Sequence, residues 1–174
     1  EADLLPSELA PVFHHFVAKC LFSTKQARPD ISTAVVFLTT RVRSPDVDDW
    51  KKLVRLIRYL RGSPEMPLIL RADSTPVMKW WVDGSHTAHL NMRGHSGGCL
   101  SLGSGMPVTG SKKQKINTRS STETELVAAD DFMPIVLWTN HFLRVQGYDS
   151  VDTLLYQDNQ SVILHEKNGR KSSG

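Results

Sequence analysis

Cysteine is scarce in this chain, and long apolar runs are missing. The only cysteines, Cys20 and Cys99, lie far apart and form no C-x-x-C pair. This excludes a disulfide-rich scaffold and a zinc ribbon, and it favours an intracellular protein with ordinary thiols. No run of about 18 apolar residues occurs, and the first residues lack the basic start and apolar centre of a signal peptide. We therefore expect a soluble protein without a membrane partner.

The chain also lacks a strong excess of charge of either sign. Its 174 residues include 21 Lys and Arg against 18 Asp and Glu, which gives a net charge of +3. So small an excess is compatible with a nucleic-acid partner but does not identify one. A compact chain of this length buries roughly 70% of its unfolded surface, so it can form a core as one domain or as a domain with an appendage.

Helical periodicity extends from about residue 7 to residue 62. Pro29 interrupts it, and Asp30 is a candidate cap for a second helix. A third helix is expected to start at Ser44-Pro45 and to end at Gly62. The positions expected to be buried are Phe13, Phe16, Val17, Cys20 and Leu21 in the first helix, Ile31, Val35 and Leu38 in the second, and Val47, Trp50, Val54, Ile57 and Arg61 in the third.

The third helix also carries a row of basic side chains that follows its acidic first turn. One interpretation is a solvated face that complements the helix dipole. The other is a rail that holds the phosphates of a nucleic acid. The basic residues concerned are Lys51, Lys52, Arg55, Arg58 and Arg61.

The period of the apolar pattern changes after the turn-rich residues 63–67, which we take as a domain boundary. In the clearest strand that follows, Trp81 and Asp83 share one face and Trp80 and Val82 share the other. The expected strands cover residues 68–70, 79–85, 97–103 and 107–110.

A long amphipathic helix is expected from Ser121 to about Gln146, and Pro134 should kink or divide it. A strand at residues 151–156 and a helix at 159–166 complete the pattern. Because a strand that follows a crossover helix can pair in parallel, this order predicts an α/β fold with a mixed sheet. The residues expected on the buried face of the long helix are Glu125, Ala129, Phe132 and Val136, with Met133 and Leu137 beside them.

Three acidic residues from different elements are candidates for a shared site. Asp83 lies in a strand between apolar residues, where an unpaired carboxylate would be costly to bury. Asp158 lies where a strand passes into a helix, as a ligand or as an N-cap. Glu125 faces the sheet, whereas Glu123 suits the helix cap. Three converging carboxylates would require a hard cation such as Mg²⁺, but the spacing alone also fits three unrelated structural acids.

A cluster of histidines offers a rival metal site. His86, His89, His95 and Cys99 fall within a short window. Their spacing matches no closed zinc site. The carboxylates are therefore the better candidates.

Several motifs resemble a known family. Asp83-Gly84-Ser85, residues 125–129 and residues 156–161 resemble the three acidic motifs of ribonuclease H. Residues 111–115, 119–125 and 158–161 are similar to the ribonuclease H region of copia-type retrotransposon polyproteins. Residues 27–31 and 50–62 are similar to the segment that joins reverse transcriptase to ribonuclease H in that family. The resemblance spans nearly the whole chain.

The resemblance implies two parts. Residues 1–62 would be a helical connection segment from the end of a reverse transcriptase, and residues 63–174 a ribonuclease H-like domain that is incomplete at its C-terminus. In that domain three antiparallel strands, a crossover helix, a parallel strand and a helix follow one another. The family's fourth carboxylate is expected beyond Gly174. The polymerase palm is absent from the sequence, so we expect no DNA synthesis from this chain.

The implied activity is hydrolysis of the RNA strand of RNA–DNA hybrids with two Mg²⁺ ions, or with Mn²⁺. Asp83 would bridge the ions, and Glu125 and Asp158 would each hold one of them. The rest of the polyprotein would be a further partner, in the cytoplasm, the nucleus or virus-like particles. The alternative is a catalytically inactive, truncated remnant that acts only as a nucleic-acid-binding or structural module.

Further residues are implied to contact the nucleic acid. Gln160 matches a family position that reaches the RNA in the minor groove, where 2′-hydroxyls distinguish RNA from DNA, and Ser121 is a second candidate. Lys112, Lys113 and Arg119 would hold phosphates at the start of the long helix. Their alternative interpretation is a solvated basic loop.

Overall fold

The computed structural model describes residues 2–74, 77–148 and 152–169. It divides into two compact units, Glu1–Leu68 and Ile69–Gly174. Each unit has its own cluster of buried apolar side chains. The assignment of the first unit to a connection segment stays a prediction.

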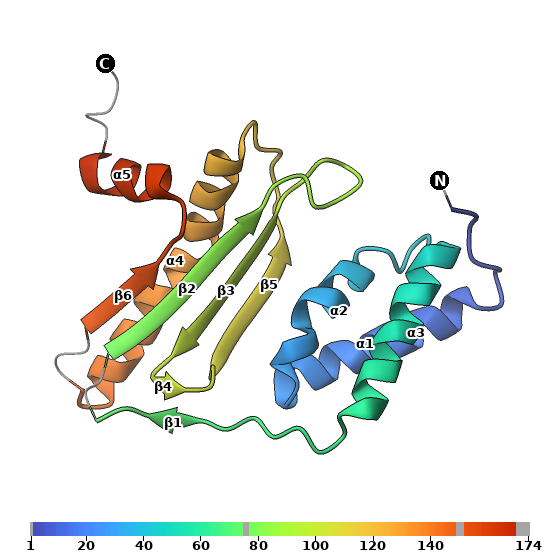
Figure 1. The fold of residues 1–174 in the computed structure, drawn as a ribbon, viewed down its shortest axis with the longest axis horizontal. Coiled ribbons are helices and arrows are strands. Elements are labelled where there is room, and N and C mark those ends of the chain that lie inside the picture. Colours follow the sequence, from blue (N-terminus) through green and yellow to red (C-terminus); the bar gives the residue numbers. More distant parts are fainter. Residues whose placement is uncertain (1, 75–76, 149–151, 170–174) are drawn as a thin grey trace. The chain divides into compact units, whose positions relative to one another are not determined.

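The first unit is helical and contains α1 (Ala10–Gln26), the short η1 (Pro29–Ile31), α2 (Ser32–Thr39) and α3 (Val47–Gly62) (Figure 1). The three predicted helices are therefore present. Phe16 was expected in the core but is 40% exposed, so α1 buries a narrower stripe than its pattern suggests. The core consists of Leu5, Phe13, Val17, Cys20, Ile31, Val35, Leu38, Leu53 and Leu56.

The predicted caps of the second and third helices are wrong. Asp30 lies within η1 and pairs with Arg28 at 2.8 Å, so it does not cap α2. At α3 the N-cap is Asp46 rather than Ser44, and the Asp46 carboxylate accepts a hydrogen bond from the Asp49 N–H at 2.7 Å. An acidic N-cap satisfies a backbone donor that has no partner within the helix.

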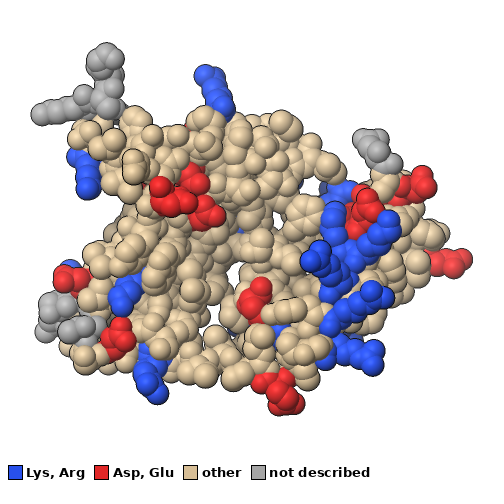
Figure 2. Space-filling view, in the orientation of Figure 1, with Lys and Arg blue, Asp and Glu red and all other residues tan. Residues whose placement is uncertain are grey.

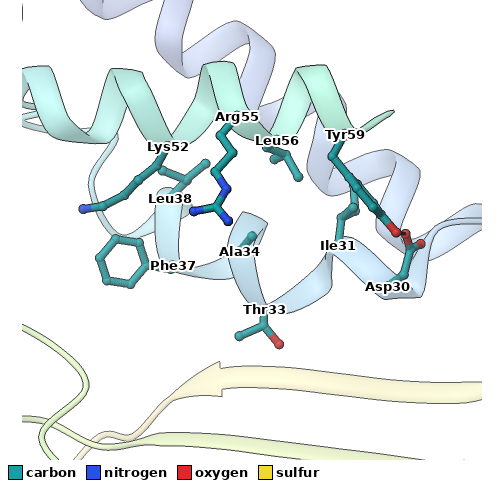
Figure 3. A pocket seen from close by; sticks show the side chains of 10 residues that line it. All are labelled: Asp30, Ile31, Thr33, Ala34, Phe37, Leu38, Lys52, Arg55, Leu56 and Tyr59. Atoms are coloured by element: carbon teal, nitrogen blue, oxygen red, sulfur yellow. Dashed lines mark hydrogen bonds between the residues drawn. The ribbon is translucent and has the colours of Figure 1, made fainter. Parts of the chain in front are cut away.

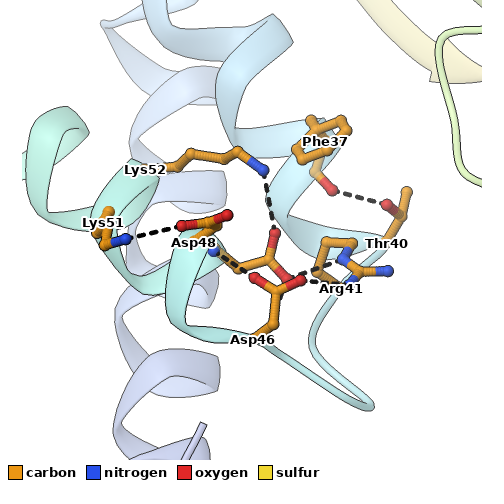
Figure 4. A network of polar contacts seen from close by, with 8 residues as sticks. Phe37, Thr40, Arg41, Asp46, Asp48, Lys51 and Lys52 are labelled. Atoms are coloured by element: carbon orange, nitrogen blue, oxygen red, sulfur yellow. Dashed lines mark hydrogen bonds and ion pairs between the residues drawn. The ribbon is translucent and has the colours of Figure 1, made fainter. Parts of the chain in front are cut away.

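The face of α3 that is buried differs from the predicted one, because an ion-pair network holds part of it against the core. Arg41 donates to the Asp49 carboxylate at 2.8 Å and to the Asp46 carboxylate at 3.1 Å (Figure 4). Asp49 is buried, together with Leu53 and Leu56, because this network holds it against the core. The predicted inner residues of α3 are half-buried, apart from Arg61, which is exposed.

The second unit is built on a mixed sheet with the strand order β5-β3-β2-β6 (Figure 1). β2 (Val77–Ser85), β3 (His95–Ser101) and β5 (Val108–Lys113) are antiparallel neighbours, and β6 (Asp152–Tyr156) pairs with β2 in parallel. The predicted mixed α/β arrangement is confirmed.

A strand predicted at residues 68–70 is wrong. These three apolar residues are exposed and lie outside the strands. Pairing begins only at β1 (Arg71–Ala72), which runs antiparallel to β4 (Gly103–Ser104). A short apolar run without a neighbouring strand has no partner for its backbone groups.

α4 (Ser121–Val145) is the crossover helix and packs on the sheet through one apolar face. It passes through Pro134 as a single helix. Met133 and Leu137 were expected beside the buried face but are 37% and 63% exposed. α5 (Gln160–Asn168) follows β6. The buried residues of this core are Met78, Trp80, Val82, Leu100, Ala128, Phe132 and Val136.

Glycines in β3 and β5 make room for the Phe132 ring of α4. A Cβ atom at Gly98 would lie 2.6 Å from ring atoms of Phe132, and one at Gly110 would lie 2.7 Å away. These distances are shorter than any ordinary contact. Both positions must therefore lack a side chain if α4 is to lie this close to the sheet.

We expect Gly98→Ala to lower the free energy of unfolding of the sheet unit by about 1–3 kcal/mol, because overpacking must move the ring or the helix. Gly97→Ala is the matched control, since a Cβ there meets only the Asp83 carbonyl oxygen at 4.0 Å. Urea unfolding of both variants measures the difference. Equal stability of the two variants would contradict this account of the packing.

Candidate metal centre

The register of two parallel strands brings Asp83 and Asp158 to one edge of the sheet. Trp81 of β2 is the pairing partner of Tyr156 of β6, and their rings stack with centroids 5.2 Å apart. Asp83 lies two residues beyond Trp81, and Asp158 lies two residues beyond Tyr156. Because parallel strands end at the same edge, this equal offset places both acids side by side.

Alternation along β2 decides which way Asp83 points. The two faces divide as the sequence predicted: Trp80 and Val82 are buried on one, and Trp81 and Asp83 are exposed on the other. The carboxylate of Asp83 is therefore not buried. Asp158 is also exposed and follows the end of β6. The expected alternative role of Asp158 as an N-cap belongs instead to Asn159, whose side-chain oxygen accepts from the Ser161 and Val162 N–H groups.

Glu125 reaches the same place from the first turns of α4. The helix is capped by Ser120, which accepts from the Glu123 N–H at 3.1 Å, and the Glu123 carboxylate accepts from the Arg119 N–H. Glu123 therefore stabilises the helix end, as expected. Glu125 lies further along the helix, is buried, and faces the sheet.

Gly84 fixes the position of Glu125. The Gly84 N–H donates a hydrogen bond of 2.8 Å to Glu125 Oε2. A Cβ atom at Gly84 would lie 2.8 Å from the Thr124 carbonyl oxygen. The absent side chain thus lets α4 approach β2 closely enough for this hydrogen bond.

The three acids form one cluster whose oxygens lie close enough together to hold a metal ion. Ligand oxygens of Asp83, Glu125 and Asp158 all lie within 4.8 Å of one another. Within the part of the chain that the structure describes, this is the one group of three or more potential ligands so arranged. Figure 2 shows acidic side chains gathered on the sheet unit beside α5 and the start of α4.

Burial raises the pKa of Glu125, and the negative charge of Asp83 raises it further. Hydrogen bonds from Gln157 and from the Gly84 N–H act in the opposite direction, because they stabilise the charged form, while Asp158 adds a further rise. The pKa of Glu125 thus stays above its usual range. The site holds more negative charge than its own hydrogen bonds compensate, which suits a divalent cation.

Gln157 is a site residue that the sequence analysis missed. Its side-chain Nε2 donates to Glu125 Oε2 at 3.3 Å, and its side-chain Oε1 accepts from the Asn159 N–H at 3.2 Å. A neutral amide next to Asp158 gives no charge pattern to notice. Its position at the end of a strand, beside an acid, was the available signal.

The residues expected to contact nucleic acid lie in different settings. Gln160 and Ser121 are exposed at the first positions of α5 and α4. Arg119 is exposed just before the cap of α4. Lys112 and Lys113 are in β5 rather than in a loop, and Lys112 pairs with Asp131 of α4 at 2.8 Å. A role for any of these five in binding stays a prediction.

The histidine cluster is internally hydrogen-bonded. His89 Nε2 and His95 Nδ1 are 3.0 Å apart, and His95 Nε2 lies 2.7 Å from the Ser111 hydroxyl. His86 Nδ1 contacts the hydroxyls of Thr118 and Thr124 at 3.2 and 2.9 Å. Among the described residues, these histidines and Cys99 do not form a metal-binding group.

Comparison with known proteins places the chain among retrotransposon polyproteins. It is 30% identical over 153 residues, 87% of its length, to the retrovirus-related Pol polyprotein from transposon TNT 1-94 of Nicotiana tabacum. It is 30% identical over 134 residues, 76% of its length, to the corresponding polyprotein from transposon RE2 of Arabidopsis thaliana. The chain belongs to the retrovirus-related Pol polyproteins of copia-type transposons. The resemblance to copia-type retrotransposon polyproteins is thereby confirmed.

This Pol segment also matches a putative transposon Ty5-1 protein of Saccharomyces cerevisiae, with 33% identity over 68% of the segment and 39% of the relative. It spans 11% of the Nicotiana polyprotein and 9% of the Arabidopsis one. No protein-family model matches it, and no solved structure gives a significant match. A search of the described residues finds no helix long and apolar enough to cross a membrane.

We expect the sheet unit of this Pol segment to lose stability as the pH falls from 6.5 towards 4. Burial, the charge of Lys113 and the charge of His95 lower the pKa of His89 from 6.5 to about 4. In this pH range the unfolded chain binds a proton at His89, whereas the folded chain does not. The free energy of unfolding, which has its full value above pH 6.5, therefore falls by up to about 3 kcal/mol.

Urea unfolding at a series of pH values measures this loss. His89→Gln should make the profile between pH 4 and 6.5 less steep, and exposed His141→Gln should not. A profile that is equally steep in both variants would rule out His89 as the cause.

Gln157→Leu should raise the pKa of Glu125 above its value in the parent chain. The substitution removes an N–H donor that stabilises the charged carboxylate. The pH titration of the Glu125 side-chain carboxyl carbon by NMR, without metal, measures the change. Gln160→Leu, at the exposed start of α5, is the control. If Glu125 titrates at the same pH in both variants, Gln157 does not support it.

Proposed function

We propose that this Pol segment contributes a ribonuclease H activity, which hydrolyses the RNA strand of RNA–DNA hybrids. The observation that carries the proposal is the convergence of Asp83, Glu125 and Asp158 from β2, α4 and the end of β6. Three antiparallel strands, a crossover helix, a parallel strand and a helix match the order expected of a ribonuclease H-like fold. Membership of the Pol family supports the same function.

The residues of the cluster fit magnesium. Carboxylate oxygens are the ligands that Mg²⁺ prefers, and Mn²⁺ accepts the same set. In our proposal Asp83 would contribute to holding both ions, and Glu125 and Asp158 would each hold one of them. Bound ions of this kind lower the pKa of a water nucleophile and stabilise charge on the leaving oxygen of a phosphodiester.

The chain's own residues organise the site before any ligand binds. The Gly84 N–H and the Gln157 amide hold one oxygen of Glu125, which orients its carboxylate. Gln160 is exposed at the start of α5, shortly after Asp158 in the chain. Ser121 is exposed at the start of α4, shortly before Glu125. There they would reach the 2′-hydroxyls that mark the RNA strand.

Cleavage of an end-labelled RNA–DNA hybrid in Mg²⁺ tests this proposal. Asp83→Asn should lower the rate by more than about 100-fold, since loss of even an outer-shell partner of a metal ligand costs about 10–100-fold. Asp130→Asn, an exposed acid of α4 outside the cluster, should leave the rate unchanged.

Two results would contradict the proposal. One is cleavage that Asp83→Asn does not slow, which would point to a contaminating nuclease. The other is hybrid binding without any cleavage in Mg²⁺ or Mn²⁺, which would favour an inactive nucleic-acid-binding module.

A further inference from the structure

The helix α3 carries an excess of positive charge that the fold does not use. Between Val47 and Gly62 it has five basic residues and two acidic ones. This surplus of three equals the net charge of the entire chain. Figure 2 shows basic side chains gathered over the helical unit on the side where α3 lies in Figure 1.

The acids of α3 are all engaged at its start. Asp48 pairs with Lys51 at 2.9 Å, and Asp49 pairs with Arg41 at 2.8 Å and with Lys52 at 3.5 Å (Figure 4). Lys52 also lies over the Phe37 ring, 4.9 Å from its centroid. These contacts engage both acids, but Lys51 keeps 71% of its side chain exposed. The arginines of the later turns remain to be explained.

Arg55, Arg58 and Arg61 are exposed and, among the described residues, form no ion pair with a carboxylate. Arg55 projects from α3 between Lys52 and Tyr59, over a hollow of about 500 Å³ with an apolar floor (Figure 3). Arg55 and Arg58 also line a shallow groove with Lys51 and Trp50. Their guanidinium groups are therefore accessible to a ligand.

Complementing the helix dipole explains one of these arginines. Arg61 lies in the last turn, where a cation is favoured, but the dipole effect falls off within that turn. Arg55 and Arg58 lie earlier. Moreover, Lys51 and Arg55 are four residues apart, and Arg55 and Arg58 are three apart. Such like-charge neighbours destabilise a helix.

We propose that Lys51, Arg55 and Arg58 form a phosphate-binding track for the backbone of the RNA–DNA hybrid. The track rests on the proposed function, since that function supplies the ligand. Along a helix these residues recur about every 5 Å, and each strand of a duplex presents a phosphate about every 3.4 Å of its axis. A polyanion relieves the repulsion between neighbouring cations, which gives the charge pattern a physical reason.

The salt dependence of hybrid binding tests the track. The full chain with Asp83→Asn, which prevents cleavage, is titrated with a fluorescent RNA–DNA hybrid at several salt concentrations without divalent metal. Adding Arg55→Gln and Arg58→Gln should make the slope of log K against log salt shallower by about 1.8, at about 0.9 for each phosphate contact.

Lys19→Gln with Lys25→Gln is the matched control, because it removes the same charge from exposed positions of α1. The track predicts that the control keeps the parent slope. Equal slopes in the two double variants, or no hybrid binding by the parent, would overturn it. A shallower slope in the arginine variant supports the track even if the Asp83 cluster proves unable to cleave, so the two proposals can fail separately.

Discussion

The hydrogen bond between the Gly84 N–H and Glu125 is the contact on which the candidate site depends. It joins the crossover helix to the central strand at 2.8 Å, and it forms only because Gly84 has no side chain to hold the helix away. Further along the same helix, the Phe132 ring packs against Gly98 and Gly110, where a side chain on either glycine would collide with it. Close packing of α4 on the sheet thus brings a buried acid to the two exposed ones.

The cluster crowds three carboxylates into one place. The parallel register of β2 and β6 brings Asp83 and Asp158 together. Glu125 joins them from α4, where its side chain is buried. Two hydrogen bonds to Glu125 do not offset burial and the neighbouring charges. In our proposals, a divalent cation would remove this charge imbalance, and an incoming phosphate backbone would remove the positive charge imbalance on α3. In both places the fold keeps an unfavourable charge pattern that a ligand would relieve.

Periodicity predicted the long helices and the four strands of the mixed sheet, but not their details, and it wrongly predicted a strand at residues 68–70. The alternation of Trp80, Trp81, Val82 and Asp83 correctly gave the two faces of β2, and the facing of Glu125 was also correct. The buried face of α3 was not predictable, because it depends on Arg41 holding Asp49 inward. The position of Gln157 at a strand end beside an acid was a weak signal. Its hydrogen bond to Glu125 could not be predicted, because the two residues lie far apart in the sequence and meet only in the fold.

Manganese bound in a crystal would test the central claim most directly, because Mn²⁺ accepts the ligands of Mg²⁺ and has a strong anomalous signal. Crystals of the parent chain and of Glu125→Gln, soaked in Mn²⁺, would be compared in anomalous difference maps. The account predicts a peak among the carboxylates of Asp83, Glu125 and Asp158 in the parent, weakened or lost in the variant. A parent map with no peak there, at a Mn²⁺ concentration that supports hybrid cleavage, would contradict it.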